Sequence, residues 1–484
     1  MIVGMRRAAP LAAVLLLWPA ARAEANGRFP QTTTVRFKPA AAGDSDFVLV
    51  GSSFGLLISK DRGESFRWVC EDAVYYSGIY DPDYAISENG AIYATTFSGL
   101  RVSTDDGCSF DAVGAPLTDD KFINQVEVGP DGRVWATTST GGQPNDVYVA
   151  AGDGEPFVAT GDLLTDEGDN GWWLSVATTA DDPMRIYVSG YLPQGEDTPP
   201  VGRLRRSSDG GETWDDLDAS IALETGDIDW GEKDPLFYLL GASPTDADVL
   251  FARAVAINPP LGDAIYRSDD GGDSWVRVLD FADTVSAFEI RADGLNVIAG
   301  TQNRCLDDDP EVMKGCVFVS DQAGAAESWT QPAAQPQMNC IEEHPDGTLY
   351  ACAANFAPDM FAIGSSDDAS SWDTVWRFAA FENKSTDGPL DCPEGTVQDD
   401  VCEDESSSGY QMLFCDTFML DFPECEVEEE EPDAGTVIDP PDDGGDGGCC
   451  RVGDGPPRGS AGAAVLIALW LMVWGRRRQP KTKR

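Results

Sequence analysis

The eight residues Ser59-Lys60-Asp61-Arg62-Gly63-Glu64-Ser65-Phe66 are the first complete copy of a pattern on which the fold prediction depends. The pattern places a serine, an aspartate, a glycine, a hydroxyl residue and an aromatic ring at fixed spacing. It is complete again at 103–110, 207–214 and 268–275. It is degenerate at 365–372, where Ala369 replaces the glycine, stretched at 320–329 and nearly lost at 151–157. The seven copies start 44 to 61 residues apart, which indicates an array of repeats with the length of propeller blades.

Each copy is predicted to form a hairpin turn, because a short β-rich run precedes it and another follows it. Serine and aspartate side chains can hydrogen-bond nearby backbone groups, and glycine adopts backbone conformations that other residues resist. The aromatic ring is expected to pack between sheets. The pattern is therefore interpreted as structural. The positions assigned to it are Ser59, Asp61, Gly63, Ser103, Asp105, Gly107, Ser207, Asp209, Gly211, Trp214, Ser268, Asp270, Gly272 and Trp275.

A second hairpin is predicted upstream of each copy, most clearly at 125–135, where Pro130-Asp131-Gly132 forms the turn. Two hairpins give four strands per unit, which we name A to D. Seven units fit between residues 32 and 380. The predicted fold is all-β, a seven-bladed β-propeller of four-stranded antiparallel blades. The stretch 33–37 is expected to be the innermost strand A of the first blade and 372–378 the last strand D, so that packing or cysteines must hold the seam.

The four intact motifs resemble those of the BNR or Asp-box β-propeller superfamily, which includes sialidase-like and sortilin-like proteins. The resemblance implies the propeller fold, and sialidases and xyloglucan-type glycosidases are enzymes of that superfamily. A sialidase-like site would need three convergent arginines, for which Arg36, Arg185 and Arg253 are scattered candidates. Paired acids for glycoside hydrolysis carry little information in a chain with 84 acidic residues. No catalytic residue is assigned.

Residues 1–25 are predicted to be a signal peptide, with Arg6 and Arg7 ahead of an apolar run and small residues at positions 21, 23 and 25. The alternative is a retained N-terminal anchor.

The C-terminal segment, 449–484, contains Cys449-Cys450, a Gly/Pro spacer, an apolar run predicted as a hydrophobic helix, and an arginine cluster. This order resembles the MYXO-CTERM sorting signal of myxobacterial surface proteins. The resemblance implies cleavage near Cys449 and Cys450 and attachment to the outer cell surface. The alternative is an anchor in the inner membrane.

Export permits disulfides, and ten cysteines precede the C-terminal segment. Cys340 and Cys352 are predicted to face each other across a hairpin, and Cys305 and Cys316 to staple a loop. Cys70 and Cys108 would then tie the first two blades together. Residues 381–425 form a predicted acidic Cys-rich appendage, and residues 426–448 an acidic Gly/Pro linker. Three pairings are open to the appendage cysteines, which are Cys392, Cys402, Cys415 and Cys425.

The composition sums to 33 basic and 84 acidic residues, a net charge of −51, which excludes nucleic acid as an expected partner. A single histidine excludes multi-histidine metal sites. That residue, His344, is predicted to be a solvent-exposed turn residue. No metal site or cofactor is expected beyond loose binding of a divalent cation.

Ligands of propellers usually lie on the face formed by the D–A and B–C connections, opposite the Asp-box turns. The candidate ligand residues on this face are Tyr75, Tyr76, Trp172, Trp173 and Trp230. Aromatic rings beside acids can stack on sugars or peptide side chains, and the alternative is that they pack between blades.

The predicted function is that of a noncatalytic, surface-anchored protein that binds a glycan or an extracellular protein. The alternatives are a secreted glycoside hydrolase of the sialidase or xyloglucanase type and a structural envelope protein. The membrane would be reached through the C-terminal segment, and the oligomeric state is left open.

Overall fold

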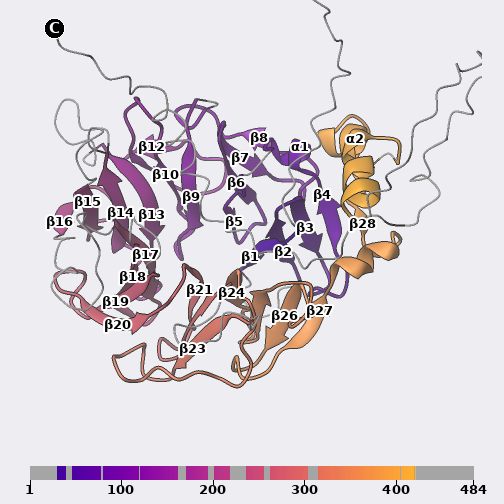
Figure 1. The fold of residues 1–484 in the computed structure, drawn as a ribbon. Helices are drawn as coiled ribbons and strands as arrows, with labels where there is room; N and C mark the ends of the chain where they lie inside the picture. Colours follow the sequence, from indigo (N-terminus) through magenta and orange to yellow (C-terminus); the bar gives the residue numbers. More distant parts are fainter. Residues whose placement is uncertain are drawn as a thin grey trace, which may run out of the picture. The chain divides into compact units, whose positions relative to one another are not determined.

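Seven sheets follow one another along the chain, and each is built from one contiguous stretch of antiparallel strands, except that the first also gains β28 (Gly388–Pro389) from near the C-terminal end (Figure 1). The computed structural model describes residues 30–39, 46–77, 80–118, 120–161, 171–193, 201–217, 236–255, 262–302, 314–403, 405–418 and 420. The predicted signal peptide and C-terminal sorting segment lie outside these residues. The predicted seven-bladed propeller is confirmed.

The strands of the first four blades run in sequence from the centre outward. Blade 1 contains β1 (Thr32–Phe37), β2 (Val48–Ser52), β3 (Gly55–Ser59) and β4 (Arg67–Val69). Blade 2 contains β5 (Tyr84–Ile86), β6 (Ile92–Thr96), β7 (Gly99–Ser103) and β8 (Asp111–Ala112). Blade 3 contains β9 (Ile123–Val128), β10 (Val134–Thr138), β11 (Val147–Ala150) and β12 (Val158–Ala159). Blade 4 contains β13 (Trp172–Ala177), β14 (Ile186–Leu192), β15 (Val201–Ser207) and β16 (Asp215–Leu217).

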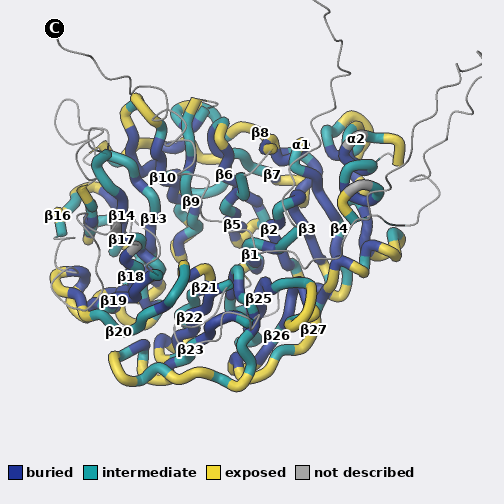
Figure 2. Tube along the Cα trace, viewed as in Figure 1, coloured by how far each residue is buried: buried dark blue, intermediate teal, exposed yellow. Residues whose placement is uncertain are grey.

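The remaining blades keep this order with one exception. Blade 5 contains β17 (Leu236–Ser243), β18 (Asp246–Val255), β19 (Ala264–Ser268) and β20 (Val276–Asp280). Blade 6 contains β21 (Val285–Ile290), β22 (Val297–Thr301) and β23 (Cys316–Ser320), and a single bridge between Val319 and Thr330 takes the place of a fourth strand. Blade 7 contains β24 (Cys340–Glu343), β25 (Leu349–Cys352), β26 (Ile363–Ser366) and β27 (Asp373–Trp376). Figure 2 shows buried residues along the strands and exposed residues at many of the turns.

The intact Asp-boxes form the predicted C–D turns and close them with side-chain hydrogen bonds. In the first copy Ser59 Oγ donates to Asp61 Oδ1 at 2.7 Å, and Gly63 N donates to Ser59 Oγ at 2.8 Å. Ser65 N donates to Asp61 Oδ1 at 2.9 Å. Gly63 has a φ of +91°, a conformation that favours glycine. The same bonds recur in the other three intact copies.

The degenerate copy in blade 7 begins one residue later than residue 365, where the repeated pattern places it. Ser366, and not Ser365, accepts the turn hydrogen bond, which comes from Ala369 N at 2.9 Å. The turn is therefore one residue shorter, and Ala369 adopts a φ of +61° in place of glycine. In the stretched copy, Gly324 N still donates to Ser320 Oγ at 3.0 Å.

Neighbouring blades are joined near the centre by side chains of one blade that accept backbone N–H groups from the innermost strand of the following blade. Asp83 accepts from Val126 N at 3.1 Å, between blades 2 and 3. Gln125 accepts from Val176 N at 2.9 Å, between blades 3 and 4. Such bonds satisfy edge groups that a blade cannot pair internally. Equivalent acceptors are Glu127 to Thr178 N, Ser175 to Leu239 N, Asp263 to Val285 N and Glu289 to Glu343 N.

The seam between blades 7 and 1 closes without exchange of strands, as expected. Arg36 in β1 donates to Glu342 of blade 7 at 2.9 Å and to the Tyr84 carbonyl of blade 2 at 3.0 Å. Asn339 of blade 7 donates to the Thr32 carbonyl at 3.0 Å. One arginine therefore connects three blades at the seam.

The chain after β27 returns to blade 1 instead of forming a separate body. Its strand β28 (Gly388–Pro389) pairs in parallel with β4. Asp387 Oδ1 accepts from Phe66 N of blade 1 at 2.9 Å and from the Trp376 indole of blade 7 at 2.8 Å. The helical segments η2 (Phe378–Glu382), η3 (Gln398–Glu403), α2 (Ser408–Tyr410) and η4 (Gln411–Thr417) complete this part of the chain. We name residues 378–420 the latch, because they contact both sides of the seam.

The disulfides correct one predicted pairing and confirm another. Cys70 and Cys108 are not bonded to each other. Cys70 pairs with Cys402 and Cys108 with Cys392, with Cα–Cα distances of 5.9 and 5.5 Å. The reason is the return of the latch, which also makes the predicted pairing within 392–425 wrong for these two latch cysteines.

The hairpin disulfide between Cys340 and Cys352 is confirmed. Cys316 and Cys415 each take part in a disulfide as well. Cys305 and Cys425 lie outside the described residues, so the pairing of Cys305 with Cys316 stays a prediction.

Replacing Asp387 by alanine should lower the free energy of unfolding by about 3 kcal/mol, because two buried N–H donors on opposite sides of the seam lose their acceptor. Urea unfolding followed by tryptophan fluorescence measures this. Asp373→Ala, which removes an exposed acid from β27, is the matched control and should change little. Equal stability of the two variants would contradict the role assigned to Asp387.

Candidate functional site

The D–A and B–C connections leave a group of half-buried aromatic rings where blades 4 and 5 meet the centre. Trp172 opens β13 and pairs with Tyr191 of β14, with ring centroids 5.4 Å apart. Tyr238 lies near the start of β17 and pairs with Arg253 of β18. The Arg253 guanidinium lies 5.0 Å from the centroid of the Tyr238 ring. We name Trp172, Tyr191, Tyr238 and Arg253 the mouth cluster.

Contacts with neighbouring residues fix the Arg253 side chain of the mouth cluster. Arg253 Nη1 donates to the Val285 carbonyl at 2.7 Å and bonds Asp263 Oδ2 at 3.2 Å. Burial raises the pKa of Tyr191 and of Tyr238, so both phenols stay protonated at neutral pH. The cluster therefore offers neutral aromatic surfaces with hydroxyl groups beside a fixed cation.

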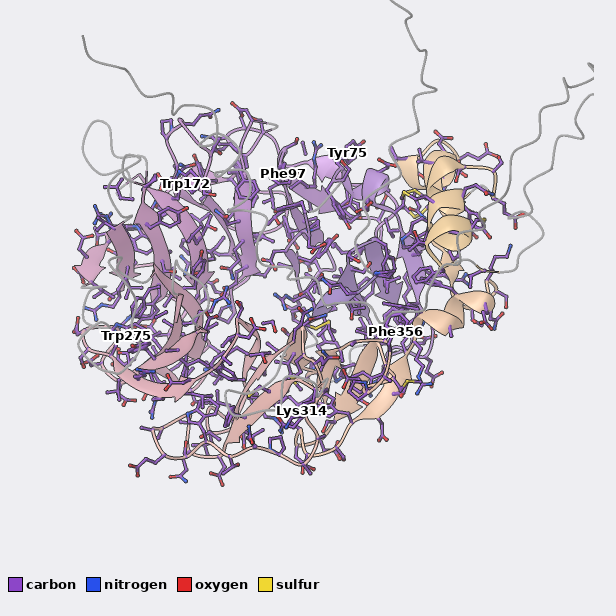
Figure 3. All side chains as sticks on the ribbon, viewed as in Figure 1. Tyr75, Phe97, Trp172, Trp275, Lys314 and Phe356 are labelled. Atoms are coloured by element: carbon purple, nitrogen blue, oxygen red, sulfur yellow. A yellow bond between two sulfur atoms is a disulfide. The ribbon has the colours of Figure 1, made fainter. Side chains whose placement is uncertain are left out.

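The five predicted ligand residues are not brought together as one site. Trp172 belongs to the mouth cluster, whereas Tyr75 lies on the side of the ring near blades 1 and 2 and is 46% exposed (Figure 3). Tyr76 and Trp173 are buried, at 5% and 2% exposure, so the prediction that they face a ligand is wrong. Trp173 packs in a blade core because side chains alternate along a strand, so that Trp173 points opposite to Trp172. Tyr76 follows the short helix α1 (Glu71–Val74) and packs in the core around blade 1, where its hydroxyl donates to the Ser52 carbonyl at 3.3 Å. Trp230 lies outside the described residues.

A group of acids lines the centre of the ring around Arg36. Burial raises the pKa of Glu127 to about 7. Burial likewise raises the pKa of Asp83 and of Glu342, against the opposing effect of Arg36, and the pKa of Glu289, beside Glu342 and Glu343, lies well above its ordinary range. These side chains keep some accessible surface, 31% for Glu342, yet protein surrounds them because they face the centre.

The central acids already have structural partners. Asp83, Glu127 and Glu289 each accept a backbone N–H of the next blade. Glu342 bonds Arg36. Within the residues that the structure describes, no group of three His, Cys, Asp or Glu residues could hold a metal ion.

The prediction that His344 is a solvent-exposed turn residue is wrong. His344 is buried, at 1% exposure, and its Nδ1 lies 2.7 Å from Asp346 Oδ1. Its ring lies 4.9 Å from that of Phe37, which comes from blade 1. His344 is therefore a packing residue at the seam, because the turn between β24 and β25 faces blade 1.

The three arginines considered for a sialidase-like site do not converge. Arg36 lies at the seam, Arg185 bonds Asp248 at 2.8 Å in blade 5, and Arg253 bonds Asp263. Each is paired with a carboxylate that would compete with an anionic substrate. The geometry therefore does not form a three-arginine carboxylate site from these residues.

Tyr191 and Tyr238 were missed at the level of sequence. Both lie in strands at positions set by register, one opposite Trp172 and the other opposite Arg253. They could have been identified by predicting the strand register of blades 4 and 5, which places Tyr191 opposite Trp172 and Tyr238 opposite Arg253.

No protein-family model matches the chain. Among curated proteins, the xyloglucanase Xgh74A of Acetivibrio thermocellus is 28% identical over 109 residues, which is 22% of this chain and 12% of that protein. The chain therefore matches only a small part of that relative's length. None of the helices in the described residues is long and apolar enough to span a membrane.

Three of the solved structures with some similarity to the chain are as follows. A GH74 xyloglucanase from Xanthomonas campestris has a TM-score of 0.31 and 15% identity, covering 69% of this chain and 57% of that one. YCF48 from Cyanidioschyzon merolae has a TM-score of 0.40 and 11% identity, covering 68% and 92%. The Cps50 (Swd1) propeller domain of Myceliophteria thermophila has a TM-score of 0.40 and 12% identity, covering 68% and 97%. The fold assignment rests on the sheet order above.

Replacing Glu127 by glutamine should flatten the pH dependence of stability between pH 8 and pH 5.5. The pKa of Glu127 is about 7 in the folded chain and 4.5 in its ordinary range, so the folded state binds a proton first and gains stability as pH falls through that window. Glutamine keeps the acceptor for Thr178 N and carries no charge. The variant should therefore melt about 3 °C or more above the unaltered chain at pH 8, and the gap should narrow at pH 5.5. Calorimetry at both pH values measures this; a gap that does not change with pH would contradict it.

Proposed function

We propose that this chain is a noncatalytic binding protein, displayed at the outer cell surface, that holds a neutral glycan at the mouth cluster. The observation that carries the proposal is the stacked pair of Trp172 and Tyr191 beside Tyr238 and Arg253. These rings are half-buried on the face formed by the D–A and B–C connections. Ligand sites commonly combine aromatic surfaces with a few fixed polar groups.

The chemistry of the mouth cluster favours a glycan over other ligands. A sugar ring has apolar C–H faces, which can stack on Trp172, and hydroxyl groups, which can bond the protonated phenols. Arg253 is oriented by Asp263 and the Val285 carbonyl, so it can donate to a neutral oxygen without becoming an unpaired charge. The net charge of −51 disfavours an anionic polymer.

The structural use of the central acids supports a noncatalytic role. Asp83, Glu127 and Glu289 join blades through backbone N–H groups, and Glu342 is paired with Arg36. A glycosidase needs two carboxyl groups that reach the scissile bond from either side. These four carboxyl groups are held by contacts within the ring, and reaching a substrate would break those contacts.

Display at the cell surface requires export, for which the predicted signal peptide is the sequence signal. The three disulfides with both partners described fit an oxidising compartment. The predicted signal peptide, the acidic linker at 426–448 and the sorting signal around Cys449 and Cys450 would place the propeller outside the cell on a stalk.

Trp172→Ala should weaken glycan binding at least tenfold, because it removes the stacking surface while leaving the blade core intact. Titration calorimetry with neutral polysaccharides, xyloglucan included, measures this. Trp372→Ala is the matched control, since Trp372 is also half-buried but lies in the Asp-box turn of blade 7 on the opposite face. The control should bind as the unaltered chain does.

Three outcomes would contradict the proposal. Absence of saturable binding to any neutral glycan would favour a structural envelope protein or a protein ligand. Equal binding by Trp172→Ala would move the site elsewhere on the ring. Shortening of xyloglucan by the unaltered chain would instead favour a hydrolase, and Glu127→Gln and Glu289→Gln would then be assayed.

A further inference from the structure

The junction between blades 5 and 6 is closed by a buried ion pair that lies beside the mouth cluster. Arg253 Nη1 donates to the Val285 carbonyl at 2.7 Å and to Asp263 Oδ2 at 3.2 Å. The same oxygen of Asp263 accepts from Val285 N at 2.9 Å. One arginine and one aspartate of blade 5 therefore hold both backbone groups of the residue that opens β21.

Closure of a junction does not require an ion pair at this position. At four other junctions an uncharged side chain donates to a carbonyl near the start of the next innermost strand, at 2.6 to 3.1 Å. A buried ion pair costs more to desolvate than neutral groups, and neutral replacements are often equally stable. The charges between blades 5 and 6 therefore need a reason other than closure. The four neutral pairs are Tyr80 with Ile123, Asn124 with Trp173, Ser286 with Met338, and Asn339 with Thr32.

The two charges of this pair differ in how a ligand can reach them. Asp263 is 2% exposed, whereas 22% of the Arg253 side chain is exposed, beside the Tyr238 ring. Both hydrogen bonds that the described residues make with the Arg253 side chain involve Nη1, which leaves Nε and Nη2 for a ligand. A ligand can therefore contact the cation but not its counter-ion.

A buried carboxylate next to an accessible guanidinium selects ligands by their charge. A ligand carboxylate bound at Arg253 would lie close to Asp263, and the repulsion would be poorly screened because Asp263 is buried. A neutral hydroxyl oxygen meets no such repulsion and still accepts a hydrogen bond from the guanidinium. Asp263 therefore disfavours acidic sugars without contacting any ligand.

We infer that Asp263 is a positioning residue that sets the charge selectivity of the mouth cluster, so that the site prefers neutral glycans to glycans with uronic acids and loses this preference when Asp263 is protonated. The role rests on the proposed glycan binding and adds to it the residue that selects the ligand and the condition that relaxes the selection.

Acidification should relax the selectivity because Asp263 gains its proton early. Burial raises the pKa of Asp263, with a further rise from Asp283, against the opposing effect of Arg253. Besides Arg253 and Asp283, the titratable group that faces it is Tyr238, whose phenol stays protonated. The carboxyl of Asp263 is therefore neutralised at a higher pH than that of an ordinary aspartate, and Arg253 then has no counter-ion.

The test measures binding of a neutral xyloglucan oligosaccharide and of an oligogalacturonate of equal length by titration calorimetry with the full, disulfide-bonded chain. At pH 7.5 the unaltered chain should bind the neutral probe about tenfold more tightly. Asp263→Asn keeps an acceptor for Val285 N and removes the charge. It should strengthen oligogalacturonate binding about threefold or more and weaken binding of the neutral probe, two opposite changes that a loss of structure would not produce. As the pH falls to 5, the two proteins should converge in their affinity for oligogalacturonate.

Asp280→Asn is the matched control, because Asp280 pairs with Arg277 in the outer strand β20 of the same blade. It should leave both affinities within about twofold. Asp263→Glu keeps the charge and should keep the preference for the neutral probe. Should Asp263→Asn not fold, the pH profile of the unaltered chain decides, and a preference that does not fall with pH overturns the inference.

Two further results would overturn the role of Asp263 while leaving glycan binding in place. One is unchanged affinity of Asp263→Asn for both probes. The other is weaker binding of the neutral probe without any gain for oligogalacturonate, which would make Asp263 a structural residue only. Failure of the unaltered chain to bind either probe would instead contradict the proposed glycan binding itself, and the role of Asp263 with it.

Discussion

Closure of the ring between blades 7 and 1 is the constraint on which the rest of the structure depends. Blade 7 contains no strand from the start of the chain, and blade 1 gains only β28 beside its outer strand β4, so the two blades share no sheet. Asp387 replaces that sheet with one carboxylate that accepts from both sides, and Arg36 joins three blades at the centre. Two disulfides then fix the latch to blades 1 and 2. The positions of all inner strands, and so of the mouth cluster, follow from this closure.

The acidic composition has two different uses in the ring. In the Asp-box turns the acids bond local backbone groups at the surface, and the hydroxyl and N–H of Thr213 lower the pKa of Asp209 to about 2. Near the centre, acids join one blade to the next, and burial raises the pKa of Glu127. Acidic residues therefore stabilise the folded state at neutral and high pH in the Asp-box turns, as at Asp209, and at lower pH near the centre, as at Glu127.

The fold could be predicted because the Asp-box is local: its serine, aspartate and glycine act within seven residues, so their spacing is visible in the sequence. The cysteine pairing could not be predicted in the same way, because Cys70 meets Cys402 only after the chain has completed the ring. The burial of His344 depends on Phe37, which is distant in sequence. Of the candidate site, Trp172 could be predicted, but its partners Tyr191 and Tyr238 depend on strand register.

The disulfide between Cys70 and Cys402 has a mechanical consequence. Tension applied to the chain beyond the latch enters blade 1 through this bond, since the 332 residues between the two cysteines lie in parallel with it. The bond between Cys108 and Cys392 bypasses blade 7 in the same way. A force along the C-terminal linker therefore cannot peel the last blade away from its neighbour. A pull on the chain beyond the latch is therefore borne by covalent bonds and not by the sheet of blade 7.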